Sequence, residues 1–266
     1  MRGRLRSVGR AVLLLPYSGL QGFRDMTFED PYRITKSYAG AVSPLVFAAS
    51  VAVGIYFGIP LHELMHRAGD MLGGGWFGPV YVDPWFGGSV YQNLLPGLIS
   101  DNSPSSLAIF GAGSTTPNYT QTGTVVDYLH AIVLQTGPSI VLTPLGLMLL
   151  RRGMRRKSAV EGGLGFSLAL IPLLDLDDLA GIFVGLLQGP SFTFVQAISE
   201  MGFLQLAPYL LAGVILAGLL YKGSKKLVGK LDSARESLLE REIFGMVEFQ
   251  PDLHPGPEFP ASPFSI

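Results

Sequence analysis

The chain has 266 residues and a formal net charge of −1; 48% of its residues are hydrophobic and only 15% are charged. Soluble domains of this size usually carry more charge, so the composition indicates an integral membrane protein. There is no cysteine, which excludes disulfides and thiolate metal sites and leaves His, Asp and Glu as possible metal ligands. The near-neutral balance and the absence of a nucleic-acid-binding motif argue against a nucleic-acid partner.

The N-terminal segment, residues 1–41, begins with four arginines among its first ten residues. The apolar stretch "AVLLLPYSGL" that follows them is too short to cross a bilayer and contains a proline. We therefore expect an interfacial helix in this segment. A cleaved signal peptide is the minor alternative, because no convincing small-residue cleavage site follows.

Four apolar runs of about twenty residues follow, each long enough to cross a bilayer as a helix. They cover residues 42–66, 128–150, 163–187 and 203–221. The sequence thus predicts an all-α integral membrane protein with about four transmembrane helices in a core of residues 42–222. Residues 223–266 are expected to form a cytoplasmic amphipathic helix and a Pro-rich tail.

The connection between the first two runs, residues 69–126, is rich in Gly, Ser, Thr, Pro and Asn. Its short aromatic or β-branched stretches "WFGPVYV" and "GSVYQ" favour a small β or re-entrant region. Connections of this length usually carry a function, so we expect a strand-pairing edge or a gate here.

Positive charges gather in three segments: the N-terminus, "RRGMRRK" after the second run, and "YKGSKKLVGK" after the fourth. The excess of Lys and Arg on cytoplasmic loops places all three on one side of the membrane. Both termini are therefore expected to be cytoplasmic in a multi-pass protein.

The stretch "LHELMH" at the end of the first run carries the most chemical information. His62 and His66 are four residues apart, so on a helix both imidazoles share one face and can bind one Zn²⁺. Glu63 lies beside such a metal, where it can take a proton from metal-activated water. The pattern also arises by chance at a polar helix end, but burying three polar groups at a membrane span is costly without a function.

A zinc hydrolase needs a third protein ligand and an open position for water. Besides the pair in the motif, the chain has only His130 and His254, and the latter lies in the tail. The third apolar run supplies three acids: Asp175, Asp177 and Asp178. Counted along the helices from the cytoplasmic side, Asp177 reaches a depth similar to that of His62, which favours a shared site. The alternative is a helix break with solvated carboxylates.

The stretches "LHELMH", "LQTGPSIVLTPLG" and "LIPLLDLDD" together resemble the three-helix core of the site-2 protease group, the M50-like intramembrane zinc metalloproteases. "FGGSV" is similar to the Gly-containing strand region of that family. The resemblance implies an enzyme that hydrolyses a peptide bond of a transmembrane protein substrate within the lipid bilayer. It makes His62, His66 and Asp177 the Zn²⁺ ligands and Glu63 the general base. Asp177 is chosen because Pro172 and Leu176 match the family pattern that ends in Leu-Asp-Gly.

Three positions depart from the family pattern. The Gly expected after the Asp is Asp178, and the two expected Asn positions are Ala169 and Val141. An Asn there would help to orient a substrate strand or an oxyanion. These departures favour an alternative function, a catalytically inactive relative that acts as a membrane binding or assembly subunit. A third hypothesis is a cation pathway in which the clustered acids are relay groups.

Overall fold

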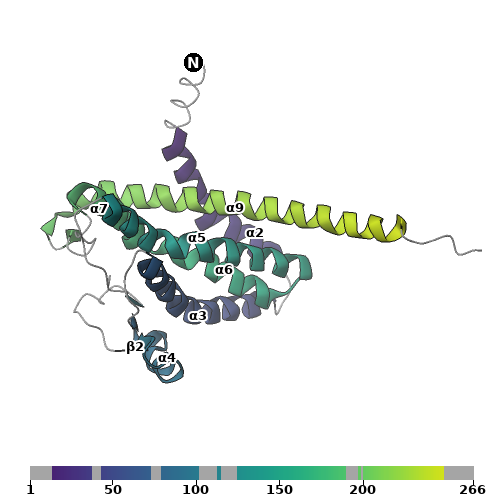
Figure 1. Cartoon of the computed structure of the whole chain (residues 1–266), viewed down its shortest axis with the longest axis horizontal. Coiled ribbons are helices and arrows are strands. Elements are labelled where there is room, and N and C mark those ends of the chain that lie inside the picture. The colour runs from purple at the N-terminus through teal and green to yellow at the C-terminus, as the bar shows by residue number, and fades with distance from the viewer. Residues whose placement is uncertain are drawn as a thin grey trace, which may run out of the picture. The chain divides into compact units, whose positions relative to one another are not determined.

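The computed structural model describes residues 14–37, 43–72, 79–101, 113–114, 125–189, 197–198 and 200–248. It divides into two units, Met1–Lys226 and Leu227–Ile266. Most of the described residues are helical, which supports the expected all-α class. The elements of the first unit carry the candidate site and are described below (Figure 1). Helix α9 (Phe203–Glu248) contributes to this unit as far as Lys226.

Three described helices are long and apolar enough to cross a membrane: α3 (Ser43–Leu72), α5 (Val125–Arg156) and α9. They contain the first, second and fourth apolar runs. The third run forms two shorter helices, α6 (Ala159–Leu174) and α7 (Leu176–Gln188), which are separated at Asp175. The backbone of Asp175 leaves the helical region there (φ −74°, ψ 75°). The expected single third span is therefore a broken helix.

The N-terminal part of the described chain is also helical. Residues 14–24 continue through a π-helical turn, η1 (Asp25–Glu29), into α2 (Asp30–Ser37). The helix formed by residues 14–24 packs closely on α9, because a Cβ placed on Gly22 would collide with the backbone of Gly218. Most of the predicted interfacial segment lies in this helix, while residues 1–13 lie outside the described part.

Helices α5 and α6 form a tight hairpin whose turn is closed by Lys157 in the left-handed region (φ 54°). Ser158 caps α6 by accepting a hydrogen bond from the backbone N–H of Glu161 (3.3 Å). Gly146 lets the two backbones touch, since a Cβ there would collide with the backbone of Ala169. Helix α3 packs against the other side of α6 (Figure 1). This hairpin returns the chain to the end of α3 that carries the histidines.

A small β region follows α3. Strand β1 (Val80–Val82) pairs in parallel with β2 (Ile99–Ser100) and antiparallel with β3 (Gly113–Ser114), and its residues are buried. Strand β1 lies within "WFGPVYV", but "GSVYQ" and the related "FGGSV" are not extended. After η2 (Pro84–Phe86), Gly87 turns the chain at φ 87° and α4 (Gly88–Leu94) begins. Much of the predicted gate, including residues 73–78, 102–112 and 115–124, lies outside the described residues.

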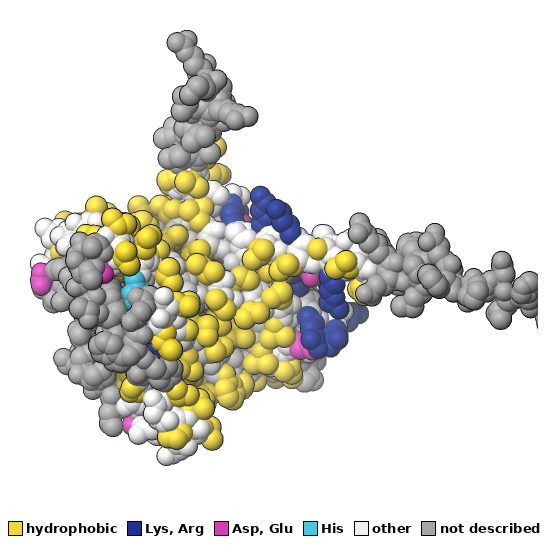
Figure 2. All heavy atoms as spheres, in the orientation of Figure 1, with side chains coloured by type: hydrophobic (Ala, Val, Ile, Leu, Met, Phe, Trp, Pro, Cys, Tyr) yellow, Lys and Arg dark blue, Asp and Glu magenta, His cyan; other side chains and the backbone are white. Residues whose placement is uncertain are grey.

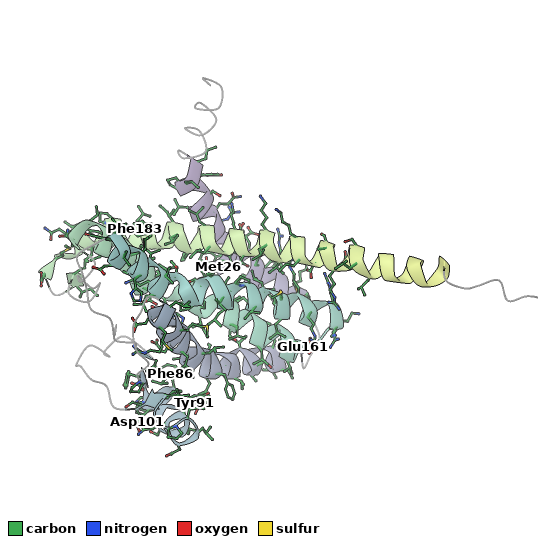
Figure 3. All side chains as sticks on the ribbon, in the orientation of Figure 1. Met26, Phe86, Tyr91, Asp101, Glu161 and Phe183 are labelled. Carbon is green, nitrogen blue, oxygen red and sulfur yellow. The ribbon has the colours of Figure 1, made fainter. Side chains whose placement is uncertain are left out.

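Helix α4 is tied to α3 through a proline. Pro60 has no N–H, so the carbonyl of Tyr56 loses its partner within α3. The hydroxyl of Tyr91 in α4 donates to that carbonyl (3.1 Å), and the rings of Tyr56 and Tyr91 are 5.4 Å apart. These contacts outweigh the weak strand pattern of "GSVYQ". Figure 3 shows Tyr91 and Phe86 near one end of α3, far from Glu161 at the start of α6.

The surface of the first unit has the distribution expected of a protein in a bilayer. Several large apolar side chains of α3 point outward and are exposed, among them Leu45, Val53 and Phe57. Hydrophobic side chains cover much of the face shown in Figure 2, Lys and Arg lie toward one end, and a histidine is visible toward the other. The basic side chains at the end of α5, including Arg155 and Arg156, are exposed. An apolar band of this kind marks a lipid or protein contact surface.

Candidate metal centre

Helix α3 supplies the first half of the site. His62 and His66 are 3% and 5% exposed, and their Nε2 atoms are 2.9 Å apart. Their rings meet edge to face, with centroids 4.5 Å apart. The one-turn spacing predicted from the motif is therefore present, and both nitrogens face a common point. Glu63, next to His62, is buried as well.

The orientation of His66 is explained by a proline in α5. Pro138 has no N–H to donate to the carbonyl of Leu134, four residues earlier. That carbonyl instead lies 2.6 Å from Nδ1 of His66. A carbonyl only accepts hydrogen bonds, so Nδ1 carries a proton, and in the neutral imidazole Nε2 then keeps its lone pair. The Gly-Pro helix thus presents His66 in the tautomer that a metal requires.

The break between α6 and α7 supplies the acids. The Oδ2 atom of Asp178 is 2.8 Å from Nε2 of His66 and 3.4 Å from Nε2 of His62. Asp175 reaches only His62, at 3.1 Å. Asp178 lies in the first turn of α7, where the helix dipole favours a negative charge. The two carboxylates are partly exposed while the imidazoles are buried, so the site opens on its acidic side.

The break itself is stabilised from α5. The last carbonyls of a helix lack intrahelical donors. The hydroxyl of Ser139 donates to one of them, the backbone carbonyl of Pro172 (2.8 Å). Thr143 donates to the carbonyl of Ala169 one turn earlier (3.2 Å). The carbonyl of Pro172 is therefore paired although α6 ends there, and both hydroxyl contacts fix the end of α6, with the acids that follow it, against α5.

The acid that reaches both histidines is Asp178, whereas the family pattern implies Asp177. The backbone of Asp177 is in α7, but its side chain lies outside the described residues, so its assignment stays a prediction. Positions 175 and 178 are three apart and share one helix face. This spacing was present in the sequence, yet it becomes decisive only once α7 is known to begin at Leu176.

The donor set fits a zinc ion. One ligand atom from each of His62, His66 and Asp178 can be chosen so that all lie within 4.8 Å of one another. Ligands about 2.0–2.1 Å from a tetrahedral ion are about 3.3 Å apart, and the three measured separations run from 2.8 to 3.4 Å. Two imidazole nitrogens and one carboxylate are a usual catalytic zinc set. The three residues therefore suit Zn²⁺ with one position left open.

A second buried polar cluster lies beyond the histidines, and the sequence analysis did not predict it. Arg67, 2% exposed, donates to Asp70 (2.8 Å) and to the carbonyl of Pro79 (3.4 Å). Nε2 of His130 is 3.4 Å from the same carboxylate. The cluster joins the end of α3 to α5 and to the start of β1. The i, i+3 spacing of Arg67 and Asp70 was the available signal.

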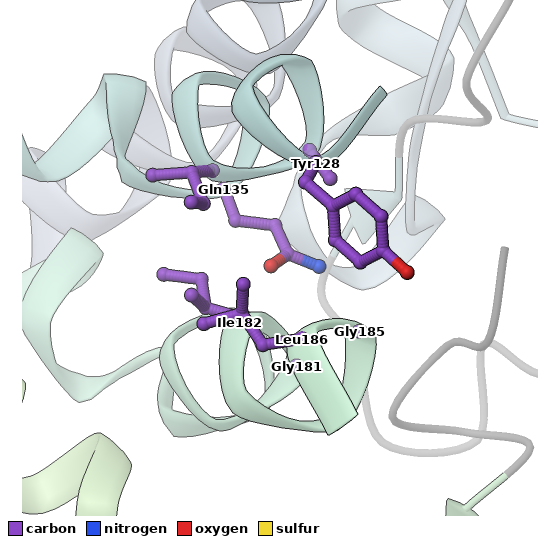
Figure 4. A pocket seen from close by; sticks show the side chains of 8 residues that line it. Tyr128, Gln135, Gly181, Ile182, Gly185 and Leu186 are labelled. Atoms are coloured by element: carbon purple, nitrogen blue, oxygen red, sulfur yellow. The ribbon is translucent and has the colours of Figure 1, made fainter. Parts of the chain in front are cut away.

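A small cavity of about 20 Å³ lies between α5 and α7, and it has room for about one water. Its walls include Tyr128 and Gln135 of α5 and Gly181 and Gly185 of α7. The amide of Gln135 points between the two helices (Figure 4). Its Oε1 is buried without a hydrogen-bond partner among the described residues, so a polar group would fit there. Gln135 directly follows Leu134, the partner of His66.

No protein-family model matches the chain, and no curated protein or solved structure is significantly similar to it. The function is therefore argued from the arrangement of this chain's own residues.

Proposed function

We propose that the chain is an intramembrane zinc metalloendopeptidase that cleaves transmembrane protein substrates. The observation that carries this proposal is the convergence of Asp178 on His62 and His66, with Glu63 buried beside them. The histidines and Glu63 lie on α3, a helix long and apolar enough to cross a membrane. A costly polar group in such a helix is best explained by function.

The ligands proposed for Zn²⁺ are His62, His66 and Asp178, with Asp177 kept as the alternative acid implied by the family pattern. The ion would polarise a peptide carbonyl and make a coordinated water nucleophilic near neutral pH. Asp175 approaches only His62. Three ligands and one open position correspond to a catalytic site, whereas a fourth protein ligand would close it.

Glu63 is the proposed general base. It is 5% exposed and interacts electrostatically with both histidines and with Asp178. It follows His62 on the helix, so it lies beside the metal ligands. Glu63 accepts a proton from the attacking water and delivers it to the leaving amine. Burial strengthens its electrostatic effect, because few water dipoles screen it.

The proposed protein is multi-pass, with both termini cytoplasmic and the metal site toward the opposite face. This orientation follows from the positive charges at the α5–α6 turn and after the fourth apolar run. A transmembrane substrate must unwind locally before its backbone can be cleaved. The short edge strands β2 and β3, on either side of β1, are proposed to pair with the unwound segment.

The test is Glu63→Gln, which removes the proton acceptor and keeps the size of the side chain. Cleavage of single-span reporter proteins co-expressed in the same membranes should fall by about 10²–10⁴-fold, while the zinc content stays unchanged. Glu161→Gln is the matched control, because Glu161 pairs with Arg152 and Arg156 at the other end of α6. Wild-type cleavage by Glu63→Gln would refute the mechanism.

The second candidate is a non-catalytic membrane subunit that keeps the metal. It is favoured by Ala169, where the family has Asn: this residue is 1% exposed and packed against α5, and it has no amide to orient a substrate. Under this alternative, the zinc-loaded wild type yields no more new protein N-termini in the membrane fraction than Glu63→Gln does. An excess of new N-termini from the wild type would exclude it.

A further inference from the structure

The cavity of about 20 Å³ between α5 and α7 lies close to the proposed metal ligands along both helices. On α5, its wall ends at Gln135, the residue after Leu134, whose carbonyl is 2.6 Å from Nδ1 of His66. On α7, its wall begins at Gly181, three residues after Asp178 and on the same helix face. Three residues advance about 4.5 Å along a helix. The cavity is therefore about one helical turn from the acid that reaches both histidines.

The lining of this cavity includes a buried hydrogen-bond acceptor. Within the part of the chain that the structure describes, Oε1 of Gln135 has no hydrogen-bond partner, and its amide points between the two helices (Figure 4). Apolar side chains form much of the surrounding wall: Ala131, Ile132, Ile182 and Leu186. A buried acceptor without a donor is costly, yet apolar walls offer a water few further hydrogen bonds. The site therefore suits a hydroxyl group attached to carbon better than it suits a water.

The space admits only the tip of a side chain. Gly185 lines it and is buried, yet a Cβ placed on Gly185 would meet no atom of the described residues within 4 Å. Leu186 also lines the cavity and is itself 46% exposed, so the cavity borders the protein surface. A volume of about 20 Å³ holds one water-sized group. The hydroxyl of a serine or threonine fits this space, whereas a peptide backbone or a large side chain does not.

We propose that this cavity is a substrate subsite that selects a serine or threonine close to the scissile bond. The substrate hydroxyl donates to Oε1 of Gln135, and the carbon that carries it contacts the apolar walls. This inference rests on the proposed protease function, because the metal ligands define where the scissile bond lies. Residues of an extended chain are about 3.3–3.6 Å apart, so a cavity one helical turn from the ligands receives a side chain one or two residues from that bond. Lipid hydrocarbon has no donor for this acceptor, whereas a transmembrane substrate can supply one.

The test uses pairs of single-span reporters that carry Thr or Val at one position, moved one residue at a time through the transmembrane segment. Threonine and valine have nearly the same shape, so each pair isolates the hydroxyl. At the preferred position, the wild type should cleave the Thr reporter with a kcat/KM about tenfold higher, since valine leaves the buried acceptor unpaired. Gln135→Leu should abolish this difference. The control, Gln188→Leu, makes the same change at an exposed glutamine of α7 outside the cavity and should keep the difference.

A second variant changes the volume of the cavity and keeps the amide. Gly185→Ala should fold, because alanine favours a helix and the added Cβ meets no described neighbour. Its methyl group takes up part of the cavity and should also reduce the preference for Thr. Gly223→Ala is the matched control, since residue 223 lies on α9 and does not line the cavity.

Binding separates this proposal from the proposed cleavage. The same reporters carry a photo-crosslinker and are captured by the full-length Glu63→Gln variant, which is expected not to cleave them. Preferential capture of Thr reporters, without cleavage by the wild type, would refute the protease and support the subsite. Cleavage by the wild type without a preference for Thr would overturn the subsite and leave the protease. The same preference in Gln135→Leu as in the wild type would also overturn the subsite.

Discussion

Replacement of Pro138 by alanine should weaken zinc binding and, at the same time, stabilise helix α5, in which residue 138 lies. In the native chain, the carbonyl of Leu134 accepts from Nδ1 of His66 at 2.6 Å, because Pro138 cannot donate to it. Alanine at position 138 has a backbone N–H, and this group can donate a hydrogen bond to the carbonyl of Leu134. His66 then loses the partner that holds its ring and its tautomer.

The two effects have opposite signs. Loss of the hydrogen bond partner of a metal-binding histidine typically costs about 10- to 100-fold in metal affinity, or about 1.4–2.8 kcal/mol. An interior proline is about 3 kcal/mol less favourable in a helix than alanine. The metal-free variant should therefore gain stability, but by less than this, because the Pro138 side chain is fully buried and its contacts are lost. Zinc affinity would be measured by competition with a chelating indicator, and stability by thermal unfolding after chelation.

Pro144→Ala is the matched control, because this second interior proline of α5 follows Ile140, a residue exposed on the protein surface. The control should gain stability and keep its zinc affinity. Unchanged zinc affinity in Pro138→Ala would refute the proposed role of the Leu134 carbonyl. An equal loss in both variants would also refute it, since the removal of any interior proline from α5 would then be the cause.

Three further predictions follow from single contacts. Asp178→Asn should lower zinc affinity by more than about 100-fold, and Asp175→Asn should lower it by less than about tenfold. The reason is that the Asp178 side chain reaches both histidines, whereas Asp175 reaches only His62. Equal losses of affinity would indicate that both acids are ligands. Gly146→Ala should lower the melting temperature by the equivalent of about 1–3 kcal/mol through a backbone collision. Gly223→Ala should raise it, because a Cβ there would meet no atom of the described residues within 4 Å. A stabilising Gly146→Ala would disprove the tight α5–α6 packing. Burial raises the pKa of Tyr91, in α4 outside the long apolar helices, to about 12. Stability should therefore fall as the pH rises from about 10, where an unfolded tyrosine ionises, toward 12. If Tyr91→Phe unfolds at the same alkaline pH as the wild type, this assignment fails.

The histidine half of the site could be predicted because it depends on local geometry alone. Four residues make about one helical turn, so His62 and His66 had to share a face once α3 was helical. Apolar-run counting ended that helix too early, at His66, whereas α3 continues to Leu72. The extension contains Arg67 and Asp70, whose charges are buried because they pair with each other. Hydropathy alone does not detect such pairing.

Which acid reaches the histidines could not be predicted from the sequence, because it depends on tertiary structure. Successive residues of a helix point about 100° apart, so the choice among three clustered acids turns on where α7 begins. Likewise, Pro138 and its i−4 carbonyl are visible in the sequence, but their meeting with His66 requires α3 and α5 to pack together. The helical "GSVYQ" stretch was mistaken for a strand candidate because its pattern is weak, and the contact of Tyr91 with α3 decides it.

The measurement that tests the central claim most directly is the metal content of the purified protein by elemental analysis. The wild type should contain about one zinc per chain, and His62→Ala with His66→Ala should contain none, while both remain folded by circular dichroism. Absence of metal from the wild type after zinc reconstitution, or equal zinc in both proteins, would contradict a metal centre at this site, and the protease proposal would fall with it.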